Sequence, residues 1–137
     1  MSLIPKDYKP HFRKSAFTDP WEPLYSRIKD IEVSLGTVLR EAHCNSRQII
    51  HGGFISALAD NAMGLSCVQI MKSQGREVKS LVTVNLSVDF TGMAKIGEWI
   101  ATESEVVKLG GSLGFVRCQL RTPDAIVARA NATFKLS

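Results

Sequence analysis

The chain has 137 residues, of which 45% are hydrophobic and 22% are charged, and its formal net charge at pH 7 is +4. A chain of this size can bury one hydrophobic core but not two, and its composition excludes an intrinsically disordered protein. The mild positive charge is spread along the sequence without a run of five or six like charges, which argues against a nucleic-acid-binding protein.

The first 20 residues show no periodicity. Residues 1–20 are polar and contain three prolines, so they are expected to form an N-terminal extension, and residues 21–137 are expected to form a single domain. Within this domain, apolar side chains at helical spacing predict a short helix over residues 21–28. Alternation of apolar and polar side chains then predicts a strand over residues 31–40.

The most apolar segment of the chain predicts a long helix. Residues 54–72 are rich in Ala, Leu, Met and Ile, which favours about five helical turns, and Gln74 followed by Gly75 is typical of a helix end. Polar side chains interrupt this segment, so it is not expected to span a membrane.

The cysteines and the N-terminal segment predict a compartment. No apolar stretch near the N-terminus resembles a signal peptide. The widely spaced Cys44, Cys67 and Cys118 indicate buried free thiols rather than a disulfide framework or a zinc site. We therefore expect a soluble protein in the reducing environment of the cytoplasm.

After the helix, the sequence alternates with period two almost to its end. Strands are predicted over residues 82–90, 98–108, 116–121 and 126–136, separated by turns that contain glycine or proline. In the first strand, polar residues alternate with an apolar set that predicts one buried face: Val82, Val84, Leu86, Val88 and Phe90. Because the connections are short, the four strands are expected to form an antiparallel meander with the helix across its apolar face, which is an α+β fold.

The predicted helix lacks a charged face. Asp60 is the only charged residue between His51 and Lys72, and a helix that is apolar nearly all round is covered on both sides. The residues expected on the face of Asp60 are mostly small: Gly53, Ser56, Ala57, Met63, Gly64 and Cys67. The opposite face is expected to pack on the sheet and carries Ile55, Leu58, Ala62 and Leu65. A second subunit or a ligand is therefore expected to cover the side of Asp60.

Two features of this helix point to catalysis. Gly52 and Gly53 leave the first backbone N–H groups accessible, and such donors at a helix N-terminus can stabilise a developing oxyanion. Asp60 is a candidate base, but it lies eight residues, or about 12 Å, from Gly52 along the same helix. Both groups reach one reacting atom only if a second subunit supplies one of them, which predicts two equivalent sites at a twofold dimer interface.

The spacing of these residues resembles that of a known family. Asn45-x5-His51-Gly52-Gly53-x6-Asp60-Asn61, together with the strand from Thr83 and the Lys95-Ile96-Gly97-Glu98 turn, resembles the hotdog-fold acyl-CoA thioesterases of the phenylacetate-degradation and acyl-CoA thioesterase 13 type. The resemblance implies a hotdog fold, in which an antiparallel sheet wraps around one long central helix. It implies hydrolysis of an acyl-CoA to the free acid and CoA, and a homotetramer made of two dimers.

The resemblance also implies a role for each matching residue. The N–H of Gly52 would polarise the thioester carbonyl, and Asp60 of the partner subunit would act as nucleophile or general base. Asn45 would position the water or the thioester, and Thr83 would orient the carboxylate or the water. His51 would shape the turn into the helix.

Further positions are expected to contact the substrate. Gly53 and Asn61 adjoin the catalytic groups, and Lys108, Gly110 and Gly111 lie in a turn that resembles the CoA-contacting region of the family. An ordinary hairpin turn explains the two glycines of that turn as well. We expect no metal, no cofactor besides the CoA of the substrate, and no nucleic-acid or membrane partner.

Two other functions stay open from the sequence. A non-catalytic acyl-CoA-binding module on the same fold would keep the helix N-terminus but would need no carboxylate at position 60. A hotdog hydratase or dehydratase would need a catalytic histidine, and neither His11 nor His43 lies in a recognisable motif. The sequence leaves the identity of the acyl group undetermined.

Overall fold

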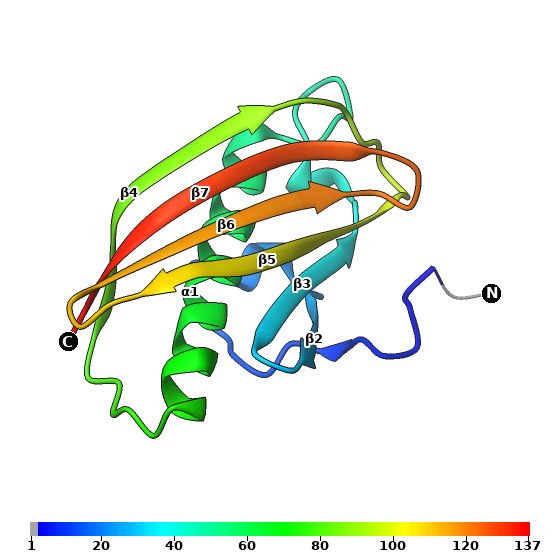
Figure 1. Ribbon diagram of the computed structural model, residues 1–137. Helices are drawn as coiled ribbons and strands as arrows, with labels where there is room; N and C mark the ends of the chain where they lie inside the picture. The colour runs from blue at the N-terminus through cyan, green and yellow to red at the C-terminus, as the bar shows by residue number, and fades with distance from the viewer. Residues whose placement is uncertain (1–2) are drawn as a thin grey trace.

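The computed structural model describes residues 3–137, in which one antiparallel sheet curves around a single long helix (Figure 1). The strands are β1 (Lys9–Pro10), β2 (Tyr25–Lys29), β3 (Glu32–Val38), β4 (Leu81–Phe90), β5 (Trp99–Leu109), β6 (Leu113–Arg121) and β7 (Ile126–Leu136). The helix α1 (Gly52–Ser73) follows β3, and two 3-10 turns cover Asp19–Trp21 and Glu41–His43. This arrangement confirms the predicted α+β class and is that of a hotdog fold.

The helix forms where the sequence predicted it, beginning two residues earlier and ending one residue later. His51 caps its N-terminus, because Nδ1 accepts a hydrogen bond of 2.7 Å from the N–H of Gly53. The chain leaves the helix through Gly75, whose φ of 71° favours glycine. By length and composition α1 could cross a membrane, but in the structure it packs into the concave face of the sheet.

The predicted helix over residues 21–28 is wrong. A 3-10 turn ends at Trp21, and the chain then runs extended into β2. Pro23 explains the difference, since proline lacks an N–H and disfavours the helical conformation of the residue before it. Accordingly, Glu22 has a ψ of 147°.

The order of strands also differs from the predicted four-strand meander. The sheet order is β1-β2-β3-β5-β6-β7-β4, so β4 pairs with β7 at one edge while β5 pairs with β3 and β6. The connection over residues 91–98 passes from β4 to β5 across the end of the sheet. Eight extended residues reach about 26 Å, whereas skipping two strands requires only about 14 Å. The connection is therefore a crossover, not a hairpin.

The N-terminal extension packs against the domain. β1 pairs with β2, and the ring of Tyr8 lies edge-on to that of Trp99 with centroids 4.9 Å apart. The N–H of His11 donates to the carbonyl of Leu24, 2.9 Å away, and the His11 side chain is buried. We call residues 9–24 the N-terminal arm.

Candidate active site

β4 differs from its predicted burial pattern. Its apolar side chains were expected on one buried face, but Val82 and Val84 are each 55% exposed and Phe90 is 57% exposed. β4 is also an edge strand, with a hydrogen-bonded neighbour on one side only. The alternation predicted that another element would bury these side chains, but no element within residues 3–137 does so.

A β-bulge in β4 decides which way Thr83 points. Thr83 pairs with Phe134 and Asn85 pairs with Thr133, so Val84 is an extra residue on β4. Residues directly opposite each other share one face of a sheet, and the buried Phe134 faces α1. Thr83 therefore faces α1 as well. Without the bulge, it would lie on the outer face with Asn85.

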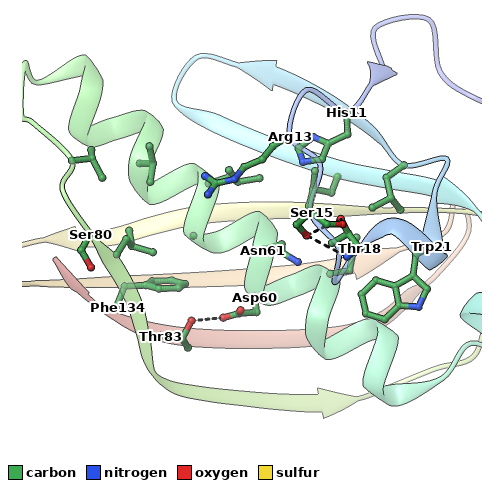
Figure 2. A pocket seen from close by; sticks show the side chains of 18 of the residues that line it. His11, Arg13, Ser15, Thr18, Trp21, Asp60, Asn61, Ser80, Thr83 and Phe134 are labelled. Atoms are coloured by element: carbon green, nitrogen blue, oxygen red, sulfur yellow. Dashed lines mark hydrogen bonds between the residues drawn. The ribbon is translucent and has the colours of Figure 1, made fainter. Parts of the chain in front are cut away.

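Thr83 meets Asp60 of α1. The Thr83 hydroxyl donates a hydrogen bond of 2.7 Å to Oδ1 of Asp60, as Figure 2 shows. Both residues line a groove of about 600 Å³ along the outer side of α1. The structure thus brings together two of the residues that the sequence singled out. The other carboxylate oxygen of Asp60, Oδ2, accepts no hydrogen bond and forms no ion pair within residues 3–137.

This groove, which we call the α1 groove, uses a different helix face from the predicted one. Its residues from α1 include Asp60, Asn61, Gly64, Leu65 and Val68. Met63 and Cys67, expected beside Asp60, are fully buried, whereas Leu65, expected against the sheet, lines the groove. The curved sheet covers more of the helix than one flat layer would, so the apolar core extends toward the predicted Asp60 face.

The N-terminal arm forms the far side of the α1 groove. Leu81 and Thr83 of β4 bound one side, and side chains of the arm bound the other (Figure 2): His11, Arg13, Ser15, Thr18 and Trp21. No site residue was predicted in this segment. Its contribution arises from long-range packing, for which the local sequence carries no periodic signal.

A second group of predicted residues lies at the start of α1. The N–H of Gly52 has no acceptor among residues 3–137, while that of Gly53 is capped by His51. A Cβ on Gly53 would stand 2.9 Å from Nδ1 of His51, so glycine at this position allows the cap. Asn45 folds its own loop, because its Oδ1 accepts from the N–H groups of Arg47 and Ile49, 2.9 and 3.3 Å away.

The predicted site residues therefore fall into three places on one chain. Gly52 and Asp60 share α1, eight residues or about 12 Å apart, so they do not meet within one chain. Gly110 and Gly111 form the β5–β6 turn, where Arg76 donates to both carbonyls at 3.0 and 3.2 Å. Lys108 is exposed beside this turn. Asn61 lines the α1 groove beside Asp60. Gly52, Lys108, Gly110 and Gly111 do not line this groove.

Several titratable groups outside this pair are buried. His43 is fully buried, its Nδ1 accepts from the N–H of Arg40 and its Nε2 donates to the carbonyl of Trp21, and burial lowers its pKa. Cys67 and Cys118 are buried as predicted, and burial raises the pKa of Cys118 to about 11. Cys44 is only partly buried, contrary to prediction. Both nitrogens of His43 are occupied by backbone, so it offers no free catalytic nitrogen.

Comparison with known proteins places the chain among thioesterases. The thioesterase superfamily matches residues 47–128, a range that contains Gly52, Asp60 and Thr83 but not the N-terminal arm. A putative esterase of Pseudomonas aeruginosa, PA0474, is 34% identical over 138 residues and covers 99% of both chains. Mouse acyl-coenzyme A thioesterase 13 is 28% identical over 99 residues, which cover 69% of this chain and 66% of the mouse protein.

Solved structures share the fold. A hypothetical thioesterase from Streptococcus pneumoniae with coenzyme A has a TM-score of 0.75 at 18% identity, covering 85% of this chain and 90% of that one. The conserved protein PA5202 from Pseudomonas aeruginosa has a TM-score of 0.77 at 22% identity, covering 90% and 95%. Because the family match spans more than half of the sequence and the fold agrees, this chain belongs to the thioesterase superfamily.

Proposed function

We propose that this chain is an acyl-CoA thioesterase whose active site forms between two copies, with Asp60 and Thr83 from one and the N–H of Gly52 from the other. The observation that carries the proposal is the 2.7 Å hydrogen bond from Thr83 to Asp60 in an open groove. On the same helix, the unpaired Gly52 N–H lies too far away to serve the same reacting atom. Relatives named acyl-coenzyme A thioesterases support the substrate class.

The hydrogen bond from Thr83 suits Asp60 for base catalysis. It occupies Oδ1 and fixes the carboxylate, so that Oδ2 is free to accept a proton from water. As the proton leaves, the water oxygen forms a bond to the thioester carbon and the carbonyl electrons move onto oxygen. The partner's Gly52 N–H stabilises that oxyanion. Collapse breaks the C–S bond, and the CoA thiolate takes the proton back from Asp60.

Asp60 can instead attack the thioester directly. Oδ2 would then displace CoA thiolate and form an anhydride, which water would hydrolyse in a second step. A single turnover in ¹⁸O-labelled water separates the two routes. With enzyme in excess, base catalysis puts ¹⁸O into the acid product, whereas attack of water on the Asp60 carbonyl carbon of the anhydride leaves ¹⁸O on Asp60.

The exposed edge strand supports the two-copy site. β4 presents unpaired backbone groups together with the exposed side chains of Val82, Val84 and Phe90. A long apolar edge strand is a liability for a soluble chain unless another element covers it. A second β4, antiparallel to the first across a twofold axis, would cover both edges at once and continue the sheet. A pair of such dimers would give the tetramer that the sequence resemblance implies.

The first experiment compares two Asp→Asn variants against a panel of acyl-CoAs, with release of free CoA thiol as the readout. We expect Asp60→Asn to fold and to lower kcat at least about a hundredfold, since it removes the base. Asp124→Asn, in the exposed β6–β7 turn, makes the same chemical change and should leave kcat within about twofold. Equal rates for Asp60→Asn and wild type would refute the assignment. Binding of acyl-CoAs without hydrolysis would favour the binding-module alternative.

Mixed dimers test whether the site is shared. Gly52→Pro removes the amide hydrogen at a helical position that tolerates proline. When inactive Gly52→Pro and inactive Asp60→Asn chains are unfolded and refolded together, half of the dimers are mixed and each holds one intact site. The mixture should recover about a quarter of wild-type activity. No recovery would mean that both groups act within one chain.

A further inference from the structure

The N-terminal arm carries polar side chains into the α1 groove that the proposed mechanism does not use. Ser15 and Thr18 engage each other, with their hydroxyls 3.1 Å apart. Within residues 3–137, Nδ1 of His11 and the side chain of Arg13 have no hydrogen-bond partner, although both residues line the groove (Figure 2). Arg13 is exposed and therefore available to a ligand, whereas His11 is buried behind it with one nitrogen unpartnered.

His11 is held in place but is not satisfied. Only 7% of the residue is exposed, and its backbone N–H is fixed by the carbonyl of Leu24. Its Nδ1 is buried and makes no hydrogen bond within residues 3–137. A buried polar group that has lost water without gaining a partner destabilises the folded chain. A ligand group that bonds to this nitrogen would remove that destabilisation.

Arg13 places an uncompensated charge beside His11. It forms no ion pair or hydrogen bond with any side chain among residues 3–137, whereas its neighbour Lys14 pairs with Glu22 at 3.6 Å. Figure 2 shows Arg13 on the arm side of α1, and Asp60, the one acidic residue of the groove lining, bonded to Thr83 on the β4 side. The carboxylate of Glu22, whose charge also acts on His11, is paired with Lys14, so the charge of Arg13 is the one left for an anion on this side of the groove.

Between the two sides, the groove has apolar side chains as well as the amide of Asn61. Leu65, Val68, Leu81 and Phe134 line it. A ligand that matches the whole groove has a reactive end at Asp60, an apolar body, and an anionic far end at the arm. Guanidinium and imidazole together bind a carboxylate through charge-assisted hydrogen bonds.

We propose that the N-terminal arm selects acyl groups that end in a carboxylate, with Arg13 and His11 as the residues that bind it. This inference rests on the proposed thioesterase function, because it places the acyl group in the groove beside Asp60. The substrates are then CoA thioesters of short dicarboxylic acids. The charged tip remains at the exposed guanidinium while the methylene groups lie on the apolar lining.

The test measures binding without turnover. In the Asp60→Asn background, we would determine dissociation constants for hexanoyl-CoA and adipoyl-CoA by calorimetry, since both acyl groups have six carbons and only the second ends in a carboxylate. We expect adipoyl-CoA to bind about tenfold more tightly. Adding Arg13→Gln should reduce that ratio to within about twofold, and His11→Phe should lower it in part. Lys9→Gln, on the same arm but outside the groove, should preserve it.

Three results would overturn the proposal. The Asp60→Asn protein could bind the two thioesters with equal affinity, or it could bind neither. Alternatively, Arg13→Gln could lose affinity equally for both thioesters and for free CoA. The last would place Arg13 on the phosphates of CoA. Hydrolysis is measured separately with wild-type protein. An enzyme that hydrolyses hexanoyl-CoA without preferring adipoyl-CoA would retain the proposed function and lose only this inference.

Discussion

β4 and β7 lie side by side in the sheet, and both alternate apolar and polar residues, yet they differ in what covers them. The apolar set of β7 is buried under α1: Ala128, Ala130, Ala132, Phe134 and Leu136. In β4, Val82, Val84 and Phe90 stay exposed in the single chain. Alternation therefore reports that a face will be buried but does not identify the cover. For β7 the cover is the chain's own helix, and for β4 we propose a second copy.

The two strands differ in regularity as well. β4 gains one residue at Val84, so its face reverses there, and Thr83 turns toward Asp60. The bulge lies at the one point of the edge where a polar side chain meets the candidate base. Bulges are frequent beside active sites because they redirect a side chain without changing the rest of the ladder.

The largest effect on stability is expected in β7, whose apolar side chains are buried under α1. Phe134→Ala in β7 removes a side chain that is 1% exposed and leaves a cavity against α1, so the free energy of unfolding should fall by about 3–5 kcal/mol in urea. Phe115→Ala, on the outer face of the neighbouring β6, should cost less than about 1 kcal/mol. Similar losses for the two variants would contradict the distinction between inner and outer faces.

The next effect probes the β4 edge. Val84→Lys should raise the dimer dissociation constant at least about a hundredfold, because it places a charge at the proposed interface, while the unfolding free energy of the isolated monomer stays within about 0.5 kcal/mol. Sedimentation velocity across a concentration series measures this, and activity should fall with the dimer. Val107→Lys is the matched control, because Val107 on β5 is similarly exposed. A Val84→Lys protein that remains dimeric would remove β4 from the interface.

A smaller effect is expected from the bulge. Thr83→Val keeps the β-branched shape but removes the hydroxyl that bonds Asp60, so kcat should drop about tenfold with KM within about twofold. Thr133→Val on β7 makes the same change away from Asp60 and should leave kcat unchanged. If Thr83→Val retained full kcat, the hydrogen bond would have no catalytic consequence.

The smallest effect concerns His43, which lies in the core independently of any partner. Burial lowers its folded pKa below the usual value, so above about pH 6.5 both folded and unfolded chains hold it neutral and stability is complete. As the pH falls below about 6.5, the unfolded chain gains a proton that the folded chain does not, and the unfolding free energy decreases until the folded pKa is reached. Urea unfolding between pH 8 and 5 measures this slope.

Replacing the histidine tests the assignment. His43→Gln should be less stable at every pH but should show a shallower loss between pH 8 and 5, because one titrating group is absent. The control is His51→Gln, because His51 is an exposed histidine that caps the helix N-terminus outside the core. An unchanged slope in His43→Gln would assign the pH dependence to other groups, such as His11, whose pKa burial also lowers.

The sequence by itself determined most of the elements and singled out the candidate site residues. Hydrophobic periodicity predicted α1 and the strands β3 to β7, because helix and strand periods are local properties of the chain. It also placed Gly52 and Asp60 on one helix about 12 Å apart, which is why a second copy enters the proposal. The prediction of a helix over residues 21–28 was wrong because Pro23 outweighed apolar spacing.

Only the tertiary structure decided which elements meet. The pairing of β4 with β7, the bulge that turns Thr83 to Asp60, and the arm that brings His11 and Arg13 to the α1 groove all join residues distant in sequence. Such contacts depend on the lengths of connections and on the fit of side chains across the whole core, and no local pattern records either. The periods of the sequence thus specify which residues form each element, and long-range packing specifies which of them share a site.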